Sequence, residues 1–259
     1  MEQARYYICQ SCMTPVPTGH KFCGRCGTNV PEDELKLQER YFSDMQDPAK
    51  ARLVLIRGEG QEGLSYHLKA SQHVVGRKGQ IEFPDDQFIS PRHANLFYRD
   101  GRLTVRDEGS ANGTYVRIRQ SAELSPGDTF IAGDQLLRVE PMPHDADQAD
   151  AQGTYFYASP VAAAAFRVTQ VLEGGAVGLT FCARGEAAEI GREGCDLNFR
   201  DDPYLSPKHC RVEQRGNKFV VTDLGSKNGV YARLKTEQPL DHGDYLFIGR
   251  KLLRVELNA

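Results

Sequence analysis

Polar side chains that suit an oxyanion occur twice in this chain of 259 residues, in the same order each time. The motif Ser-Pro-Arg-His at 90–93 recurs as Ser-Pro-Lys-His at 206–209. A Gly-Arg pair precedes each motif and an Asn-Gly pair follows it, and the second copy lies 115 or 116 positions after the first. One module has therefore been duplicated. A guanidinium, a hydroxyl, a second cation and an amide together suit an anion of high charge density, and phosphate is the natural candidate.

The repeated residues fall between short segments rich in β-branched, aromatic or leucine residues, which indicate strands. These segments are 52–56, 68–75, 94–98, 103–106, 114–116 and 136–139 in the first copy, and 166–172, 188–190, 210–213, 219–223 and 252–255 in the second. Turn signals such as Asp100-Gly101 separate them, and neither copy has a long helical periodicity. The sequence therefore predicts an all-β chain with two antiparallel β-sandwiches in tandem, whose loops carry the repeated polar residues.

The repeated motifs resemble the forkhead-associated (FHA) domain, over about residues 52–141 and 166–257. Gly-Arg, Ser-x-x-His, Ser-x-Asn-Gly and a later Gly-Asp carry the resemblance, which implies two FHA-like sandwiches that read phosphothreonine. It implies arginine and serine as phosphate ligands, asparagine as a clamp on the peptide backbone, and His93 and His209 as residues that fix the serine loop. With the second cation, the residues expected to bind phosphothreonine are Arg77, Ser90, Arg92 and Asn112 (the first site) and Arg192, Ser206, Lys208 and Asn228 (the second site).

The two copies depart from the family pattern at two positions. The residue after the serine often helps to hold phosphate, but here it is a proline, which has no N–H to donate. The residue before the asparagine, frequently threonine, is Ala111 in the first copy and Lys227 in the second. We therefore expect the second site to bind phosphate more tightly, by about the 1.5 to 3 kcal/mol of a hydrogen bond to a charged group.

Four cysteines near the N-terminus have the spacing of a metal site. Two Cys-x-x-Cys pairs, Cys9 with Cys12 and Cys23 with Cys26, supply four thiolates, which close a tetrahedral shell around a structural Zn²⁺. The stretch resembles the short zinc ribbons of many bacterial proteins, although Met13 replaces the usual glycine. Unrelated free cysteines and a redox pair are the alternatives, and no βαβ pattern supports the second.

The motifs divide the chain into five segments. We expect a zinc ribbon at 1–31, a linker at 32–50, one sandwich at 51–141, a flexible linker at 142–165 and the other sandwich at 166–259. Leu37, Tyr41 and Met45 have helical spacing, so the first linker is predicted to contain a short helix that ends at Pro48.

Composition and missing motifs narrow the function. No nucleophile elbow or glycine-rich phosphate loop occurs, so we do not expect an enzyme. With 32 basic and 35 acidic residues, a surface that grips nucleic acid throughout is not expected. No apolar run approaches the roughly 18 residues of a membrane span, the N-terminus lacks a signal core, and the cysteines suit a reducing compartment, so a cytoplasmic location is expected.

The sequence predicts an adaptor that binds phosphothreonine on a Ser/Thr kinase or on one of its substrates. One alternative is a regulator whose zinc ribbon binds nucleic acid and whose FHA domains control it. Another is a scaffold that binds unphosphorylated proteins.

Overall fold

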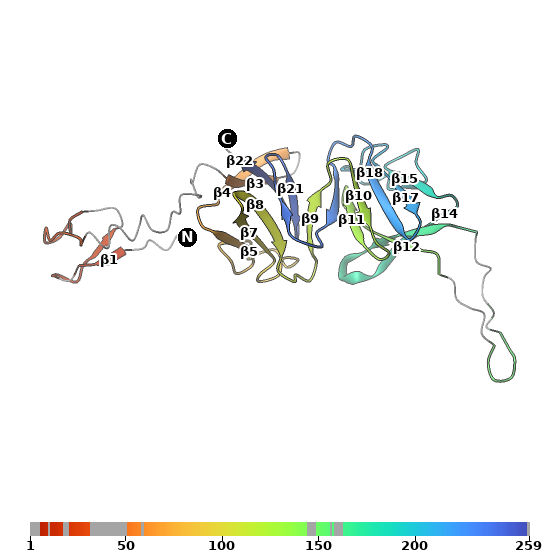
Figure 1. The fold of residues 1–259 in the computed structure, drawn as a ribbon, viewed down its shortest axis with the longest axis horizontal. Helices are drawn as coiled ribbons and strands as arrows, with labels where there is room; N and C mark the ends of the chain where they lie inside the picture. The colour runs from red at the N-terminus through yellow and green to blue at the C-terminus, as the bar shows by residue number, and fades with distance from the viewer. Residues whose placement is uncertain are drawn as a thin grey trace.

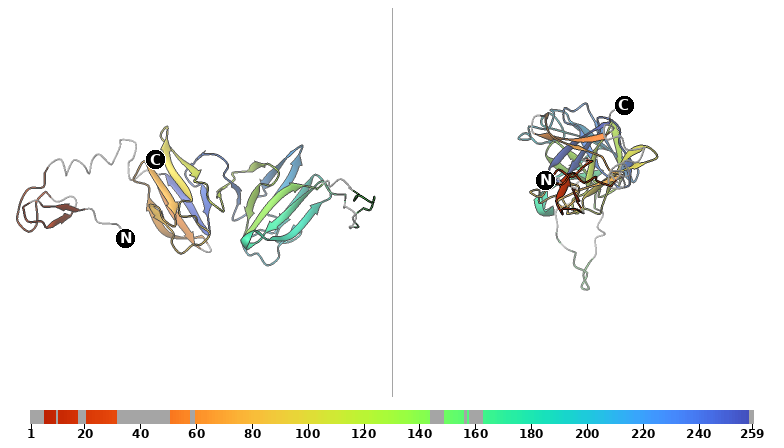
Figure 2. Two further views of the ribbon diagram at one scale, coloured as in Figure 1. Left: turned by 90° about the horizontal axis from the view of Figure 1, so that it is seen from below. Right: turned by 90° about the vertical axis from the view of Figure 1, so that its left-hand side faces the viewer.

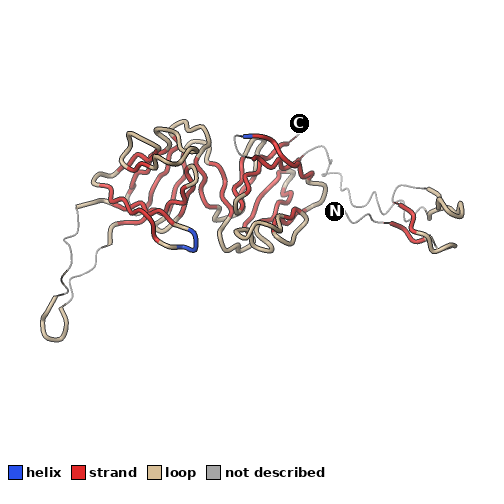
Figure 3. Tube along the Cα trace, turned by 180° about the vertical axis from the view of Figure 1, so that it is seen from behind, coloured by secondary structure: helices blue, strands red, loops and turns tan. Residues whose placement is uncertain are grey.

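The computed structural model describes residues 6–9, 11–17, 21–31, 51–57, 60–143, 149–155, 157 and 163–257. Within these ranges the regular elements are strands and short 3-10 turns, among them η2 (Glu173–Gly175) (Figures 1 and 3). The prediction of an all-β fold is confirmed. The predicted linker helix at 32–50 lies outside the described residues.

The first repeat supplies ten strands after the N-terminal segment. They are β3 (Ala51–Arg57), β4 (Gln61–His67), β5 (Gln72–Gly76), β6 (Ile81–Glu82), β7 (Ala94–Arg99), β8 (Arg102–Asp107), β9 (Thr114–Arg117), β10 (Ser121–Leu124), β11 (Thr129–Ala132) and β12 (Gln135–Pro141). The second repeat follows the same order. Its strands are β13 (Phe166–Val171), β14 (Val177–Ala183), β15 (Ala187–Gly191), β16 (Leu197–Asn198), β17 (Cys210–Arg215), β18 (Lys218–Asp223), β19 (Val230–Arg233), β20 (Gln238–Pro239), β21 (Tyr245–Ile248) and β22 (Lys251–Leu257).

These strands form three sheets. Two sheets have five strands each, in the orders β20-β8-β7-β5-β6 and β10-β18-β17-β15-β16, and the third has ten, in the order β14-β13-β12-β11-β19-β9-β21-β22-β3-β4. Each half of the long sheet packs on one five-stranded sheet. The antiparallel pair β9 and β19, with Val116 opposite Ala232, joins the two halves.

The two repeats exchange their last three strands. β20, β21 and β22 of the second repeat complete the first sandwich, and β10, β11 and β12 of the first repeat complete the second (Figure 1). Figure 2 shows the exchange as blue strands among the orange and yellow ones of the first sandwich. The crossing segments, residues 118–120 and 234–237, contain no glycine or proline. Without a turn residue the chain runs on beside its neighbour, where Ile118 N donates to Val230 O and Leu234 N to Thr114 O.

The buried cores contain residues from both repeats. The first core includes Leu53, Leu96 and Val105 together with Leu246 and Leu253 from the exchanged strands. The second core likewise combines strands of the second repeat with Phe130 and Leu137 from the first. The two packed units therefore differ from the contiguous ranges 51–141 and 166–259 that the sequence led us to expect.

The remaining described segments are small. β1 (Tyr6–Ile8) pairs with β2 (Pro15–Pro17) beside the cysteines, and Phe22 bridges Asn29. Between the repeats, Ala149 bridges Tyr155 in a short turn. Among the described residues, no helix has the length and apolar character that crossing a membrane requires.

Candidate functional site

The loop that carries Ser90 is pressed against the end of β5. Arg77 N donates to Ser90 O at 3.1 Å, and Lys78 N donates to Pro91 O at 2.9 Å. A Cβ at Gly76 would collide with the Pro91 carbonyl, so only glycine permits this approach. The Arg77 side chain is anchored as well, since its Nε donates to Ile89 O at 2.7 Å. The Gly-Arg pair thus places an exposed guanidinium beside Ser90.

A buried histidine holds the serine loop against the asparagine turn. His93 is fully buried, its Nδ1 accepts a bond from Ser90 N at 3.0 Å, and its Nε2 lies 3.0 Å from Gly113 O. Nδ1 is therefore the unprotonated nitrogen, and Nε2 carries the hydrogen. Ser90 Oγ accepts from Ala111 N at 3.1 Å, which fixes the hydroxyl oxygen and leaves its O–H to donate.

Hydrogen bonds through Ser110 and Asp107 fix the turn that carries Asn112. Ser110 Oγ accepts from Gly113 N at 2.9 Å and donates to Asp107 at 2.7 Å. Burial of Asp107 favours its neutral form, but bonds from Ser110 and Thr114 outweigh this and hold the pKa of the carboxyl below its usual value. Asn112 is exposed, and its Nδ2 donates to Phe88 O at 2.8 Å, so its side-chain oxygen remains an acceptor.

The second site repeats the backbone, histidine and asparagine contacts of the first. Arg192 N donates to Ser206 O at 3.0 Å, and a Cβ at Gly191 would collide with the carbonyl of Pro207. His209 Nδ1 accepts from Ser206 N at 3.1 Å, and its Nε2 lies 3.0 Å from Gly229 O.

The asparagine turn of the second site is also the same. Ser206 Oγ accepts from Lys227 N at 3.1 Å, and Asn228 Nδ2 donates to Tyr204 O at 2.7 Å. Arginine, serine and asparagine of each predicted set are therefore brought together on one loop surface.

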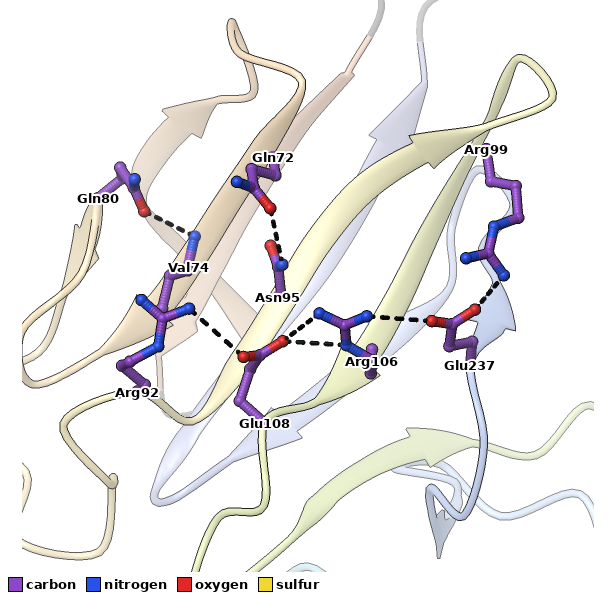
Figure 4. A network of polar contacts seen from close by, with 9 residues as sticks. All are labelled: Gln72, Val74, Gln80, Arg92, Asn95, Arg99, Arg106, Glu108 and Glu237. Carbon is purple, nitrogen blue, oxygen red and sulfur yellow. Dashed lines mark hydrogen bonds and ion pairs between the residues drawn. The ribbon is translucent and has the colours of Figure 1, made fainter.

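The second cations are paired with glutamates, and the pairs differ between the sites. Arg92 lies 3.4 Å from Glu108, which also binds Arg106 at 2.7 Å, and Arg106 and Arg99 both bind Glu237 of the crossing segment (Figure 4). The pKa of Glu108 is lowered, chiefly by its hydrogen bond with Arg106.

In the second site Lys208 pairs instead with Glu189 at 3.0 Å, which raises the pKa of the lysine. Leu224 occupies the position that corresponds to Glu108. The chain of ion pairs in Figure 4 is thus particular to the first site.

Two hairpin turns that the sequence did not assign to a site hold the site loops from the other repeat. Asp86, three residues before Ile89, accepts from Arg250 N at 2.9 Å, and Asp202 accepts from Asp134 N at 2.8 Å. A Cβ at Gly249 would collide with Ile89. Asp86 and Asp202 stand 116 positions apart, so a search of the whole repeat for paired acids would have found them.

Each asparagine turn also meets an arginine of the opposite repeat. The guanidinium of Arg233 lies against Gly113, and that of Arg117 lies against Gly229. Both arginines come from β9 and β19, the strands that pair across the junction. The surroundings of each site are therefore built by both halves of the chain.

The four N-terminal cysteines lie together. Their sulfur atoms are all within 4.8 Å of one another, with 3.6 Å between Cys9 and Cys26 and between Cys12 and Cys23. Sulfurs bound to one zinc at about 2.3 Å lie at similar separations in a tetrahedron, so this cluster can bind a metal ion. A hydrogen bond with Thr28 is the main reason that the pKa of Cys26 falls to about 6, which favours the thiolate.

The backbone repeats the same knuckle around both pairs. Met13 N donates to Cys9 O and Gly27 N to Cys23 O, each at 2.8 Å. Met13 has a φ of 57°, in the left-handed region that glycine adopts without strain. Methionine in place of glycine at position 13 thus puts a side chain at a strained backbone position but leaves the sulfur positions intact.

Comparison with known proteins agrees with this geometry. The FHA domain model matches residues 73–133 and 188–249, which include both sets of site loops. Both repeats are thus similar to the FHA domain. Each matched range ends in strands that pack in the other sandwich, so the FHA sequence unit and the packed FHA sandwich are different sets of residues here.

The similar proteins include relatives from Corynebacterium and Mycolicibacterium. An oxoglutarate dehydrogenase inhibitor of Corynebacterium diphtheriae is 37% identical over 94 residues, which make up 35% of this chain and 66% of that protein. The FHA domain-containing protein FhaB of Mycolicibacterium smegmatis is 31% identical over 88 residues, 33% of this chain and 57% of that protein. The chain thus spans less than two thirds of the length of either relative.

Among solved structures, one from a study of phosphothreonine-dependent FHA domain interactions aligns with 81% of this chain and 98% of its own, at 12% identity and a TM-score of 0.32.

Proposed function

We propose that the chain is an adaptor that binds phosphothreonine on other proteins through its two FHA domains. One observation carries this proposal: an arginine, a serine hydroxyl and an asparagine amide converge on one loop surface, and the same serine and asparagine contacts build it twice. FHA domains are phospho-motif readers. The implied partner is a Ser/Thr kinase or one of its substrates, and the role is binding without catalysis.

In this proposal each side chain has a defined task. The guanidinium of Arg77 or Arg192 pairs with the phosphate, and the O–H of Ser90 or Ser206 donates to it. The side-chain oxygen of Asn112 or Asn228 accepts an N–H of the peptide backbone, in keeping with the Nδ2 bond that already orients each amide.

Arg92 and Lys208 add positive charge at the edge of the two sites. Their glutamate partners compete only weakly with phosphate, because both cations are 62% exposed and exposed ion pairs contribute about 0 to 1 kcal/mol. Lys227, exposed beside Ser206 in place of Ala111, supports the expectation of tighter binding at the second site.

For the N-terminal segment we propose a structural zinc ribbon with Cys9, Cys12, Cys23 and Cys26 as ligands. Zinc bound by four cysteines has no open position, so its contribution is to folding. The segment's small core, formed by Cys9, Val16, Cys23 and Val30, supports this proposal because half of it consists of ligands.

Calorimetric titration with phosphothreonine peptide pools tests the adaptor function. We expect wild type to bind them and to ignore phosphoserine and unphosphorylated pools. Arg77→Ala and Arg192→Ala should each remove one binding event, and the double variant should not bind. Arg215→Ala, in the hairpin at the far end of the second sandwich, is the matched control and should bind as wild type does.

Two results would contradict the proposal. Equal binding of unphosphorylated peptides would support a scaffold of the phosphate-independent kind. Full binding by the double variant would mean that the two loop surfaces are not the sites. The relative affinities of the two single variants decide whether the second site is the tighter one.

A further inference from the structure

The turn between β21 and β22 and the turn between β11 and β12 carry opposite charges at equivalent positions beside the two sites. In the first sandwich, Arg250 follows Gly249 and is held through its N–H by Asp86. In the second, Asp134 follows Gly133 and is held in the same way by Asp202. The backbone contact is the same, so the two side chains start from matching positions. One turn presents a guanidinium and the other a carboxylate.

The Arg250 side chain lies next to the peptide clamp of the first site. Its guanidinium carbon is 4.2 Å from the centre of the Phe88 ring, and the Phe88 carbonyl is the acceptor for Asn112. A ligand that contacts Asn112 therefore passes within reach of Arg250. In the second site Tyr204 takes the place of Phe88, and its carbonyl binds Asn228 while its N–H binds Asp202.

A hollow of about 680 Å³ opens at this point of the first site. It begins at Phe88 and Asn112, has Tyr115 and Phe247 in its wall, and reaches η2 on the second sandwich. It has room for a peptide side chain that flanks the phosphothreonine. Arg250 and Asp134 both line it, and Arg250, which lies over the Phe88 ring, is the cation that such a side chain would meet.

The contact that Arg250 makes across the hollow is easily replaced. Its partner is Glu173 of η2, at 3.6 Å, and the two side chains are 67% and 66% exposed. An ion pair so exposed and so long adds little to stability, so a carboxylate of the ligand can take the place of Glu173.

We propose that these two residues give the sites opposite preferences for the residues that flank phosphothreonine. Arg250 makes the first site select peptides with an acidic flanking residue, and Asp134 makes the second site select peptides with a basic one. Each site is thus tuned by a residue from the opposite repeat. The inference rests on the phosphothreonine-binding function proposed above.

The test isolates one site at a time in the full-length chain. Arg192→Ala leaves the first site, and Arg77→Ala leaves the second. Each is titrated with phosphothreonine peptides in which one of the three positions on either side is Asp or Lys and the others are neutral. At the best position we expect the first site to prefer Asp about threefold to fivefold, and the second site to prefer Lys by a similar factor.

Charge reversal then assigns the preferences. Arg250→Asp in the Arg192→Ala background should turn the preference of the first site towards Lys, and Arg250→Gln should remove it. Asp134→Arg in the Arg77→Ala background should turn the second site towards Asp. Arg215→Asp makes the same change of charge far from both sites and should alter neither preference.

The outcomes separate this inference from the function on which it rests. If wild type binds no phosphothreonine peptide, the proposed function fails. If phosphothreonine binding stands but Asp and Lys peptides bind each site equally, or if Arg250→Gln and Asp134→Arg leave the preferences unchanged, the inference is overturned and the function remains.

Discussion

Buried histidines connect the serine loop of each site to the asparagine turn, and this makes the second site sensitive to pH. His209 is fully buried, and burial lowers its pKa below the usual 6.5. Protonation of Nδ1 would also break the bond from Ser206 N. Between the folded and unfolded pKa values the unfolded chain binds more protons, so stability rises with pH. We therefore expect the second sandwich to lose stability as the pH falls below about 6.5.

Denaturant unfolding between pH 7.5 and 5.5 measures this effect. Wild type should lose up to about 1.4 kcal/mol per pH unit more than His209→Asn, which cannot titrate. His67→Asn, at an exposed position, should retain the pH dependence of wild type. Identical slopes for wild type and His209→Asn would show that this histidine does not control stability.

At the scale of residues, repetition is what made the site predictable. Arg77, Ser90 and Asn112 each have a counterpart of the same type in the second copy, and the structure brings each set together. The sequence did not assign Arg250 or Asp134 to a site, because the repeat changes the residue type there. The sequence does not indicate which sandwich either turn contacts.

At the scale of elements, the N-terminal segment gives a prediction about metal removal. Among its described residues the apolar core consists of Val16 and Val30 besides buried cysteines, too little to stabilise a fold without metal. A chelator should therefore abolish protection from hydrogen exchange in residues 6–31 and leave β3 to β22 protected. Mass spectrometry with and without chelator measures this. Cys23→Ser should mimic the chelator, and protection that survives both treatments would contradict a zinc fold.

Some strands were predictable from a buried face, although β11, β19 and β21 also have buried residues and were missed. β7 and β17 have the apolar and turn signals of a half-buried strand, and both were expected. β4 and β10 were missed because they lie at sheet edges and are largely exposed, with sequences as polar as Gln61–His67. An edge strand on such a surface has no apolar pattern to reveal it.

At the scale of the whole molecule, the exchange could not be predicted from the sequence. β11 and β12 have nearly the same burial pattern as β21 and β22, so either set fits either sandwich. The path of the crossing segments decides which strands complete each sandwich. The lack of turn residues in these segments indicates an exchange only once β9 and β19 are known to pair. Duplication of a module creates this ambiguity.

The exchange predicts that the two halves of the chain stay together after the linker is cut. A protease site in place of Gln152 and Gly153, in the short turn between the repeats, would separate the chain into two fragments. Each sandwich would still bury several large apolar side chains of the other fragment, each worth about 1.5 to 3 kcal/mol. The cut protein should therefore elute as one particle of unchanged size in native buffer and as two fragments in denaturant. If each repeat closed on its own strands, the fragments would separate without denaturant, and both the strand order and the origin of the two tuning residues would have to be reassigned.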